Sequence, residues 1–154
     1  GQVVAWGDPE RGADISSVKA QLEDQGIDAV WSSHEAAFLV RLRDGQVVAW
    51  GDPERGADIS SVKAQLEEPG IDAVWSTDSA FLARLCDGRV LAWGITNLGA
   101  NISSVKAQLE EQGIDAVWCS GAAFLVRLRN GQVLAWGSTE DGADISTVKA
   151  ELEA

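Results

Sequence analysis

A serine, a histidine and an acidic residue stand together in the segment Ser32–Glu35, and this combination is typical of hydrolytic catalysis. His34 is the only histidine in the chain. A catalytic triad needs a base that is oriented by a third group converging on it in space, and adjacent loop residues rarely achieve this. The corresponding segments read Thr77-Asp78 and Ser120-Gly121, so the set does not recur. We therefore expect a solvated loop, and we assign no catalytic residue.

Carboxylates gather in the loop at residues 8–14, where Asp8, Glu10 and Asp14 could offer oxygen ligands to calcium. A calcium site needs six or more oxygens at fixed positions. The equivalent residues 95–101 read I-T-N-L-G-A-N and contain no carboxylate. The sequence therefore favours a solvated turn, and we expect no metal site.

The two cysteines, Cys86 and Cys119, belong to no C-x-x-C motif, so neither a zinc site nor a redox centre is indicated. We expect isolated thiols, with a disulfide between neighbouring repeats as the alternative. Phosphate-binding glycine loops, H-E-x-x-H and G-x-S-x-G are absent. The expectation is a protein that is not an enzyme and that binds no cofactor.

Tryptophan is the most frequent aromatic residue, with seven in the chain. Four lie in A-W-G segments and three end the segments I-D-A-V-W. Regular recurrence favours packing between repeats, but interfaces with partners also favour tryptophan, above all for the second set. The residues predicted to bind a partner protein are Trp31, His34, Glu35, Trp75, Asp78 and Trp118.

The composition suits one globular domain, with 154 residues of which 45% are hydrophobic. There are 24 acidic against 12 basic residues, and this balance opposes binding to nucleic acid or to an anionic membrane. No apolar run approaches the ~20 residues that a membrane span needs, and no signal pattern opens the chain. Because the chain starts with Gly1 and lacks methionine, we expect a processed or excised piece. Nothing in the sequence assigns a cellular location.

Basic residues form a stripe near the predicted hairpins. They are Arg41, Arg43, Arg84, Arg127 and Arg129. They could contact an acidic partner, but the abundance of neighbouring aspartate and glutamate favours pairing within the chain. Exposed pairs of this kind add little stability.

The chain is one unit repeated. The segment G-Q-V-V-A-W-G starts at Gly1 and recurs, with small changes, at Gly45, Gly88 and Gly131. Residues 1–23 and 45–67 are identical, which indicates recent duplication or a copied unit. We predict a single repeat domain over residues 1–154, in which each unit stacks on its neighbours. Its repeats are 1–44, 45–87 and 88–130, followed by the partial repeat 131–154.

Each unit begins with a predicted strand, here Gln2–Trp6, and continues through a loop into an amphipathic helix. Asp14 stands where the N-cap of this helix belongs, and Gly26 where the helix stops. The later units repeat the caps at Asp58, Asn101 and Asp144 and the stops at Gly70 and Gly113. In the second unit Pro69 adds to the stop signal.

Two further strands follow, at 27–31 and 37–42, and Asp44-Gly45 is a strong hairpin signal before the next strand. The sequence predicts antiparallel three-stranded meanders at about 27–51, 71–94 and 114–137. Phe38, Val40 and Leu42 lie on one face of the sheet and Leu39 on the other. A small sheet that is apolar on both faces needs cover on both sides, which stacked copies supply.

The strand x-V-x-A-W-G (Val4, Trp6), the strand I-x-A from Ile27, the strand A-F-x-x-x-L from Ala37 and the Asp44-Gly45 turn form one pattern. It resembles the regulator-of-chromosome-condensation type of β-propeller repeat over essentially the whole chain, and the short period is closer to bacterial variants. The resemblance implies a mainly β fold of three-stranded antiparallel blades, each with one short helix. The helix stands where the family has a short outermost strand, and we expect it to replace that strand.

Three meanders are too few for a closed ring, because propellers have 4–8 blades. We therefore predict a partial ring, or one closed by a homo-oligomer, with a two-fold dimer of six blades as the first expectation. An open α/β solenoid built from parallel strand–helix–strand crossovers is the alternative fold.

The resulting functional prediction is a noncatalytic repeat scaffold for protein–protein interaction or self-assembly. Its specificity would lie in the loops 32–36, 76–79, 95–98 and 119–122, where the units differ most. One alternative is a protein inhibitor of an enzyme that uses aromatic rim loops, as a β-lactamase inhibitory propeller among the bacterial relatives does. Another is an engineered or excised repeat piece without native activity. No motif supports the nucleotide-exchange role of the chromosome-condensation regulators.

Overall fold

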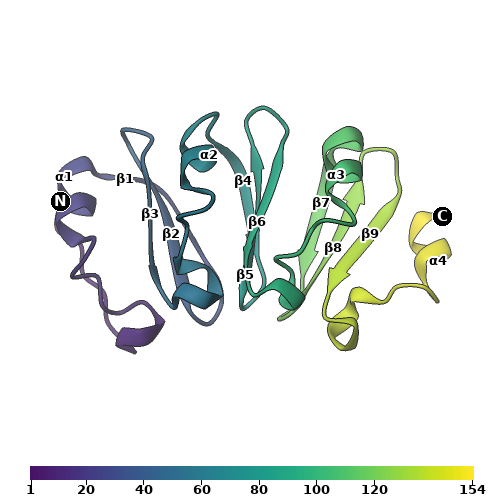
Figure 1. Ribbon diagram of the computed structural model, residues 1–154, viewed down its shortest axis with the longest axis horizontal. Helices are drawn as coiled ribbons and strands as arrows, with labels where there is room; N and C mark the ends of the chain where they lie inside the picture. The colour runs from purple at the N-terminus through teal and green to yellow at the C-terminus, as the bar shows by residue number, and fades with distance from the viewer.

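The computed structural model describes residues 1–154 and shows three small antiparallel sheets in a row (Figure 1). We call them blades 1 to 3, and each has three strands in chain order. Blade 1 holds β1 (Ile27–Ser32), β2 (Ala37–Leu42) and β3 (Val47–Gly51), blade 2 holds β4 (Ile71–Ser76), β5 (Ala80–Leu85) and β6 (Val90–Gly94), and blade 3 holds β7 (Ile114–Cys119), β8 (Ala123–Leu128) and β9 (Val133–Gly137). The three predicted meanders are confirmed. The two termini lie at opposite ends of the row, which does not close (Figure 1).

The Asp-Gly turns determine where β2 and β3 pair. The side chain of Asp44 accepts a hydrogen bond from the Gln46 N–H at 2.9 Å, and Gly45 has a φ of 90°, which glycine adopts without strain. This turn places Phe38 opposite Trp50 and Leu39 opposite Ala49. Blades 2 and 3 have the same register, so one aromatic pair recurs in each blade.

A helical connection follows each blade, and the first one precedes blade 1. Its helices are α1 (Lys19–Gln25), α2 (Lys63–Glu67), α3 (Lys106–Gln112) and α4 (Lys149–Glu153). A short helical turn stands before each of them: η1 (Pro9–Arg11), η2 (Pro53–Ala57), η3 (Thr96–Leu98) and η4 (Thr139–Ala143). No helix is long and apolar enough to cross a membrane.

The predicted N-caps are wrong by about one turn. The α1 helix begins at Lys19, whereas the side chain of Asp14 accepts the Ser16 N–H at 2.9 Å and so stabilises a tight turn that leads into the helix. Asp58, Asn101 and Asp144 do the same in their units.

The predicted helix stops are confirmed at Gly26 and Gly113, which end α1 and α3. The α2 helix ends earlier, at Glu67, three residues before Gly70. The residue before a proline is disfavoured in the helical region, and Glu68, which precedes Pro69, is extended with φ −142° and ψ 114°.

The predicted strand Gln2–Trp6 is wrong, because residues 1–6 form no strand. The identical segment Gln46–Trp50 is paired with β2. No strand lies beside residues 2–6, so their backbone N–H and C=O groups have no neighbouring strand with which to form sheet hydrogen bonds. The segment is nevertheless held against α1, since the Val3 N–H donates to Oε1 of Glu23 at 2.8 Å.

The helices α2, α3 and α4 each lie beside the free edge of the third strand of the preceding blade. The Val47 N–H donates to Oε1 of Glu67 at 2.9 Å, and Nζ of Lys63 donates to the carbonyl oxygen of Val47 at 2.9 Å. Lys63 and Glu67 also form an ion pair one helical turn apart. Side chains of α2 thus bond backbone groups that a fourth strand would otherwise bond, as expected for a helix that replaces the outermost strand.

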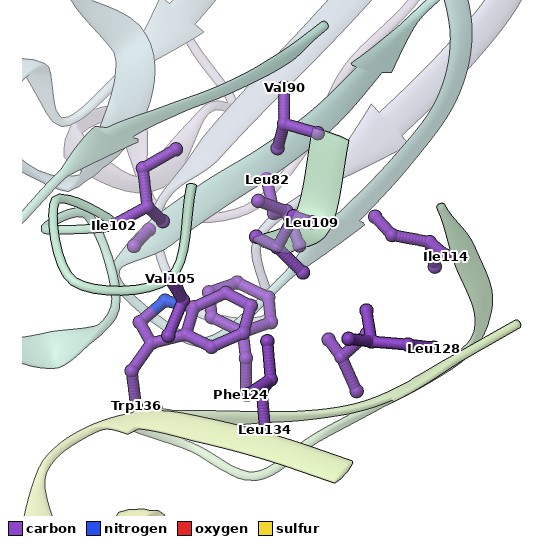
Figure 2. Close-up of a cluster of buried hydrophobic side chains, with 12 residues drawn as sticks. Leu82, Val90, Ile102, Val105, Leu109, Ile114, Phe124, Leu128, Leu134 and Trp136 are labelled. Carbon is purple, nitrogen blue, oxygen red and sulfur yellow. The ribbon is translucent and has the colours of Figure 1, made fainter. Parts of the chain in front are cut away.

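The hydrophobic core is divided into clusters that alternate with the blades. One cluster joins the β2–β3 face of blade 1, residues Ile59–Leu66 and the facing side of blade 2. The next joins blade 2, residues Ile102–Leu109 and blade 3 in the same manner (Figure 2). We call these two clusters the interior joints. The predicted stacking is confirmed, and the α/β solenoid is wrong, because all strand pairs are antiparallel.

Candidate functional site

The loops that carry several predicted site residues lie in a row along one rim. The Ser76 hydroxyl donates to the Ser32 carbonyl oxygen at 2.8 Å, and the Asp78 N–H donates to the Gly121 carbonyl oxygen at 3.0 Å. His34 and Asp78, which come from neighbouring blades, lie 3.5 Å apart between Nδ1 and Oδ1. The structure therefore brings these two predicted residues together.

Glu35, the next residue in the same loop as His34, pairs with a different group. Its carboxylate accepts a hydrogen bond from Nη1 of Arg55 at 2.8 Å, which ties the loop to η2. Ser33 is buried, and its hydroxyl accepts the Ala37 N–H at 3.0 Å. The serine therefore stabilises its own turn, and no hydrogen bond joins it to His34.

Trp31, Trp75 and Trp118 lie on the faces that their blades turn toward the next unit. Trp31 and Trp75 pack against the two interior joints, whereas Trp118 is 50% exposed. An arginine covers each ring, with Cζ of Arg41 5.6 Å from the centroid of Trp31. Arg84 and Arg127 cover Trp75 and Trp118 in the same way.

These arginines also connect successive blades. Arg41 donates from Nε to the Asp28 carboxylate at 2.7 Å and from Nη1 to the carbonyl oxygen of Ile71, in the next blade, at 2.8 Å. Arg84 repeats the second bond to the Ile114 carbonyl oxygen at 3.2 Å. The expected pairing of arginine with nearby acids is confirmed for Arg41, Arg84 and Arg127. Arg43 and Arg129 instead pack over Gly26 and Gly113.

Three of the A-W-G tryptophans are structural, as the repeat pattern predicted. Trp93 stacks on Phe81 with ring centroids 5.2 Å apart, and its Nε1 donates to the Gly56 carbonyl oxygen at 3.0 Å. A Cβ on Gly56 would lie 2.5 Å from the Phe81 ring, so only glycine fits there. The same set forms around Trp50 and Trp136, and the ring of Trp136 lies beside that of Phe124 in Figure 2.

The end of the row after blade 3 is an interior joint without its second half. Leu152 is 47% exposed, whereas the equivalent Leu66 and Leu109 are 0% and 1% exposed. Nη1 of Arg127 has no hydrogen-bond partner, and nothing lies within 4 Å of a Cβ built on Gly142. We call this surface the C-terminal face. Its hollow of about 330 Å³ is lined by Trp118, Leu125, Arg127, Val133 and Leu152.

The opposite end, before blade 1, is also incomplete. Trp6 is 85% exposed and has no phenylalanine to stack on, and Val4 and Val30 are also exposed. We call these three residues the N-terminal face. Of the residues on the two faces, the sequence predicted a binding role for Trp118 alone. The sequence did indicate that the ends are incomplete, because it contains four A-W-G segments but only three copies of the two strands that precede this segment in a blade.

The remaining candidates for chemistry are engaged in local structure. Asp8 and Asp14 accept backbone N–H groups of their own turns, from Glu10 and Ser16. Cys86 and Cys119 are free, so the alternative of a disulfide is wrong. Desolvation raises the pKa of the Cys119 thiol to about 11, which keeps it protonated and weakly nucleophilic at neutral pH.

Comparisons with known proteins agree on the fold. No protein-family model matches the sequence, and the search of curated proteins gives no match either. Prp20p from Saccharomyces cerevisiae, the yeast RCC1, superposes on 73% of this chain with a TM-score of 0.50 and 14% identity. The ectodomain of the receptor kinase CR4 from Physcomitrella patens superposes on 74% of it with a TM-score of 0.52 and 17% identity. The chain spans 31% of the length of either structure and shares the blade fold of RCC1-type propellers.

Proposed function

We propose that this chain is a noncatalytic repeat scaffold that assembles with further copies of itself into a propeller-like oligomer through the two ends of its row of blades. The observation that carries the proposal is the contrast at one repeated position. Leu66 and Leu109 are buried inside joints, while Leu152 is half exposed on the C-terminal face. Full burial of a leucine side chain contributes roughly 1.5–3 kcal/mol, so this face gains free energy when it is covered.

The polar groups of the C-terminal face indicate what would cover it. In the second interior joint, Arg84 donates to the Ile114 carbonyl oxygen and the Gly99 carbonyl oxygen accepts from Trp136. On the C-terminal face, Arg127 keeps a free Nη1, and no tryptophan indole reaches the carbonyl of Gly142. A blade of this same repeat supplies both missing partners, and blade 1 of a second copy has the required residue types.

Joining unlike ends creates either a closed ring or an open filament, according to the rotation between copies. Two copies would contribute six blades, which lies within the usual range of 4–8 blades for propellers. We therefore propose a two-fold dimer as the first product, closed by two equal contacts between an N-terminal and a C-terminal end.

Light scattering on the 154-residue chain at a series of concentrations tests this function. The expected result is a mass that rises from monomer toward dimer. Leu152→Ser should weaken the association, because it removes apolar area from the C-terminal face, and Glu111→Ser, an exposed position outside both faces, should leave it unchanged. A monomer at every concentration, for the wild type and for variants with weakened contacts between residues 1–25 and blade 1 alike, would show that the proposal is wrong.

A surface for a different protein partner is the second candidate, and the continuous row of rim loops favours it. Its support is that Nδ1 of His34 and Oδ1 of Asp78, from neighbouring blades, lie 3.5 Å apart on this rim. We propose that a partner protein would bind there, with Glu35 beside them. Substituting His34 and Asp78 by alanine should abolish capture of that partner without changing self-association.

A further inference from the structure

We infer that residues 1–25 are a removable plug on blade 1, and that the C-terminal face of a second copy takes their place during assembly. This inference rests on the proposed self-assembly and adds its route. The plug is docked on the side of blade 1 that an incoming copy must contact. Assembly is therefore an exchange of one covering segment for another and not a simple meeting of two open surfaces.

The two ends of the chain carry the same structural piece. Residues 1–24 and 131–154 both run from the A-W-G segment through a helical turn into a helix, with similar sequences. In the first, the Val3 N–H donates to Oε1 of Glu23 at 2.8 Å, and in the second the Val133 N–H donates to Oε1 of Glu153 at 2.8 Å. An interior joint contains one such piece. A contact between two chain ends brings two, so one must leave.

The plug makes the contacts that this piece makes in an interior joint. Ile15, Val18 and Leu22 pack on Val40, Leu42 and Val48 of blade 1. The Gly12 carbonyl oxygen accepts Nε1 of Trp50 at 2.8 Å. The receiving side of blade 1 is thus occupied by the chain's own N-terminal residues.

The plug lacks what a complete blade would add, because it has no strands equivalent to β1 and β2. Val30 is 52% exposed, whereas the equivalent Val74 and Val117 pack against the interior joints. No arginine reaches blade 1 in the way that Arg41 reaches the Ile71 carbonyl oxygen of blade 2.

A second copy offers the contacts of the plug and further ones. Its residues 138–153 can replace residues 8–23, and its blade 3 adds Trp118, Leu125 and the free Nη1 of Arg127. The plug has the advantage of being attached to the same chain, which gives it a high effective concentration. Exchange therefore depends on protein concentration and on the strength of the plug.

Two matched substitutions test the exchange by their opposite effects. Leu22 in the plug and Leu152 on the C-terminal face are the same position of the repeat. Leu22→Ser should loosen the plug and raise the association constant by about tenfold, and Leu152→Ser should lower it by about tenfold. If Leu152→Ser weakens assembly while Leu22→Ser weakens it or leaves it unchanged, residues 1–25 are not displaced during assembly. The proposed function then stands without this inference.

Glycine substitutions provide a second pair in case the serine variants unfold. A Cβ on Gly12 would lie 2.6 Å from the Phe38 ring, whereas one on Gly142 meets nothing within 4 Å. Both glycines have a φ near 107°, so the backbone strain is similar in both variants. Gly12→Ala should therefore promote association, and Gly142→Ala should block it, because its methyl group would meet the incoming phenylalanine.

Hydrogen exchange measured by mass spectrometry follows the plug directly. As the concentration of the wild-type chain rises, amides of residues 1–25 should lose protection while those of residues 138–153 gain it. Increased protection of both segments would overturn the exchange in favour of docking with the plug in place. If the wild type, Leu22→Ser and Gly12→Ala all remain monomeric, the proposed function is wrong and the plug falls with it.

Discussion

The backbone N–H of Val90 donates to Oε1 of Glu110 at 2.9 Å, across a gap of 20 residues in the sequence. Nζ of Lys106 in the same helix donates to the Val90 carbonyl oxygen at 2.7 Å. Two side chains of α3 thereby bond the free edge of β6. An exposed strand edge is a template for uncontrolled pairing, so the helix both attaches itself to the blade and protects that edge.

Removing the Glu110 carboxylate should destabilise blade 2. Glu110→Ala leaves the Val90 N–H without its acceptor and Lys106 without its ion-pair partner, and we expect a loss of about 1–2 kcal/mol in the free energy of unfolding. Urea denaturation followed by tryptophan fluorescence measures it. Glu111→Ala is the matched control on the same helix. Equal effects of the two substitutions would contradict the role given to Glu110.

Acid should weaken the same connections. Burial of the Glu67 and Glu110 carboxyls favours their protonated forms, but hydrogen bonds from Lys63 and Val47, and from Lys106 and Val90, outweigh it, so both pKa values lie below the usual value. A carboxyl whose pKa is lower in the folded state stabilises the fold above its unfolded pKa, and the stabilisation is lost as the pH falls through the folded pKa. Stability should therefore decline below about pH 4.5.

The acid effect is measured as the urea midpoint between pH 6 and pH 3. The variant with both Glu67→Gln and Glu110→Gln should show a shallower decline than the wild type, because two of the titrating groups are gone. The remaining slope reflects Asp14, Asp58, Asp87 and Asp144, whose pKa values are also lowered by hydrogen bonds within their turns. An unchanged slope in the double variant would count against the contribution of the two glutamates.

Gly56 should tolerate no side chain. Gly56→Ala places a Cβ 2.5 Å from the Phe81 ring and strains a backbone with a φ of 114°. Gly88→Ala introduces similar strain, at a φ of 90°, but its Cβ meets nothing within 4 Å. We expect Gly56→Ala to cost about 1–3 kcal/mol more than Gly88→Ala in urea denaturation, since overpacking adds to the strain. Equal losses would mean that the joint adapts to the methyl group.

Arg84 and Arg127 should respond differently to the same substitution. Arg84→Ala removes a bond between blades 2 and 3 and should lower the free energy of unfolding of the monomer by about 1–2 kcal/mol. Arg127 has no inter-blade partner within the chain, so Arg127→Ala should affect the monomer less and reduce its association. Denaturation at low concentration and light scattering at high concentration separate the two effects. A larger loss of monomer stability for Arg127→Ala would contradict this assignment.

Much of the fold could be predicted from local signals. The Asp-Gly turns and the alternating apolar strands placed all three meanders correctly, because hairpin chemistry acts over a few residues. Asp14 was misread because the same side chain can cap a helix or a tight turn, and only the path of the backbone decides which. Gln2–Trp6 was misread because strand formation needs a neighbour, which the segment's own residues cannot reveal.

The site was less accessible to sequence reasoning. Trp31 and Trp75, two of the predicted partner-binding residues, are half-buried and pack against the interior joints, and only the position of its blade in the row leaves Trp118 half exposed. The bond between Val47 and Glu67 has a visible signal, since a valine precedes a glutamate by 20 residues in all four units. A hydrogen bond between residues 20 positions apart becomes evident only when the structure shows that the helix runs back along the strand.

Every interior joint draws its residues from one blade, the helix that follows it and the next blade. Duplicating any stretch of 43 or 44 residues therefore adds one complete blade with its helix, wherever the stretch begins. The added blade forms the same interior joints as the existing ones. Residues 1–23 and 45–67 are identical in sequence, as such a duplication would leave them. Each added copy would extend the row by one further blade and its helix.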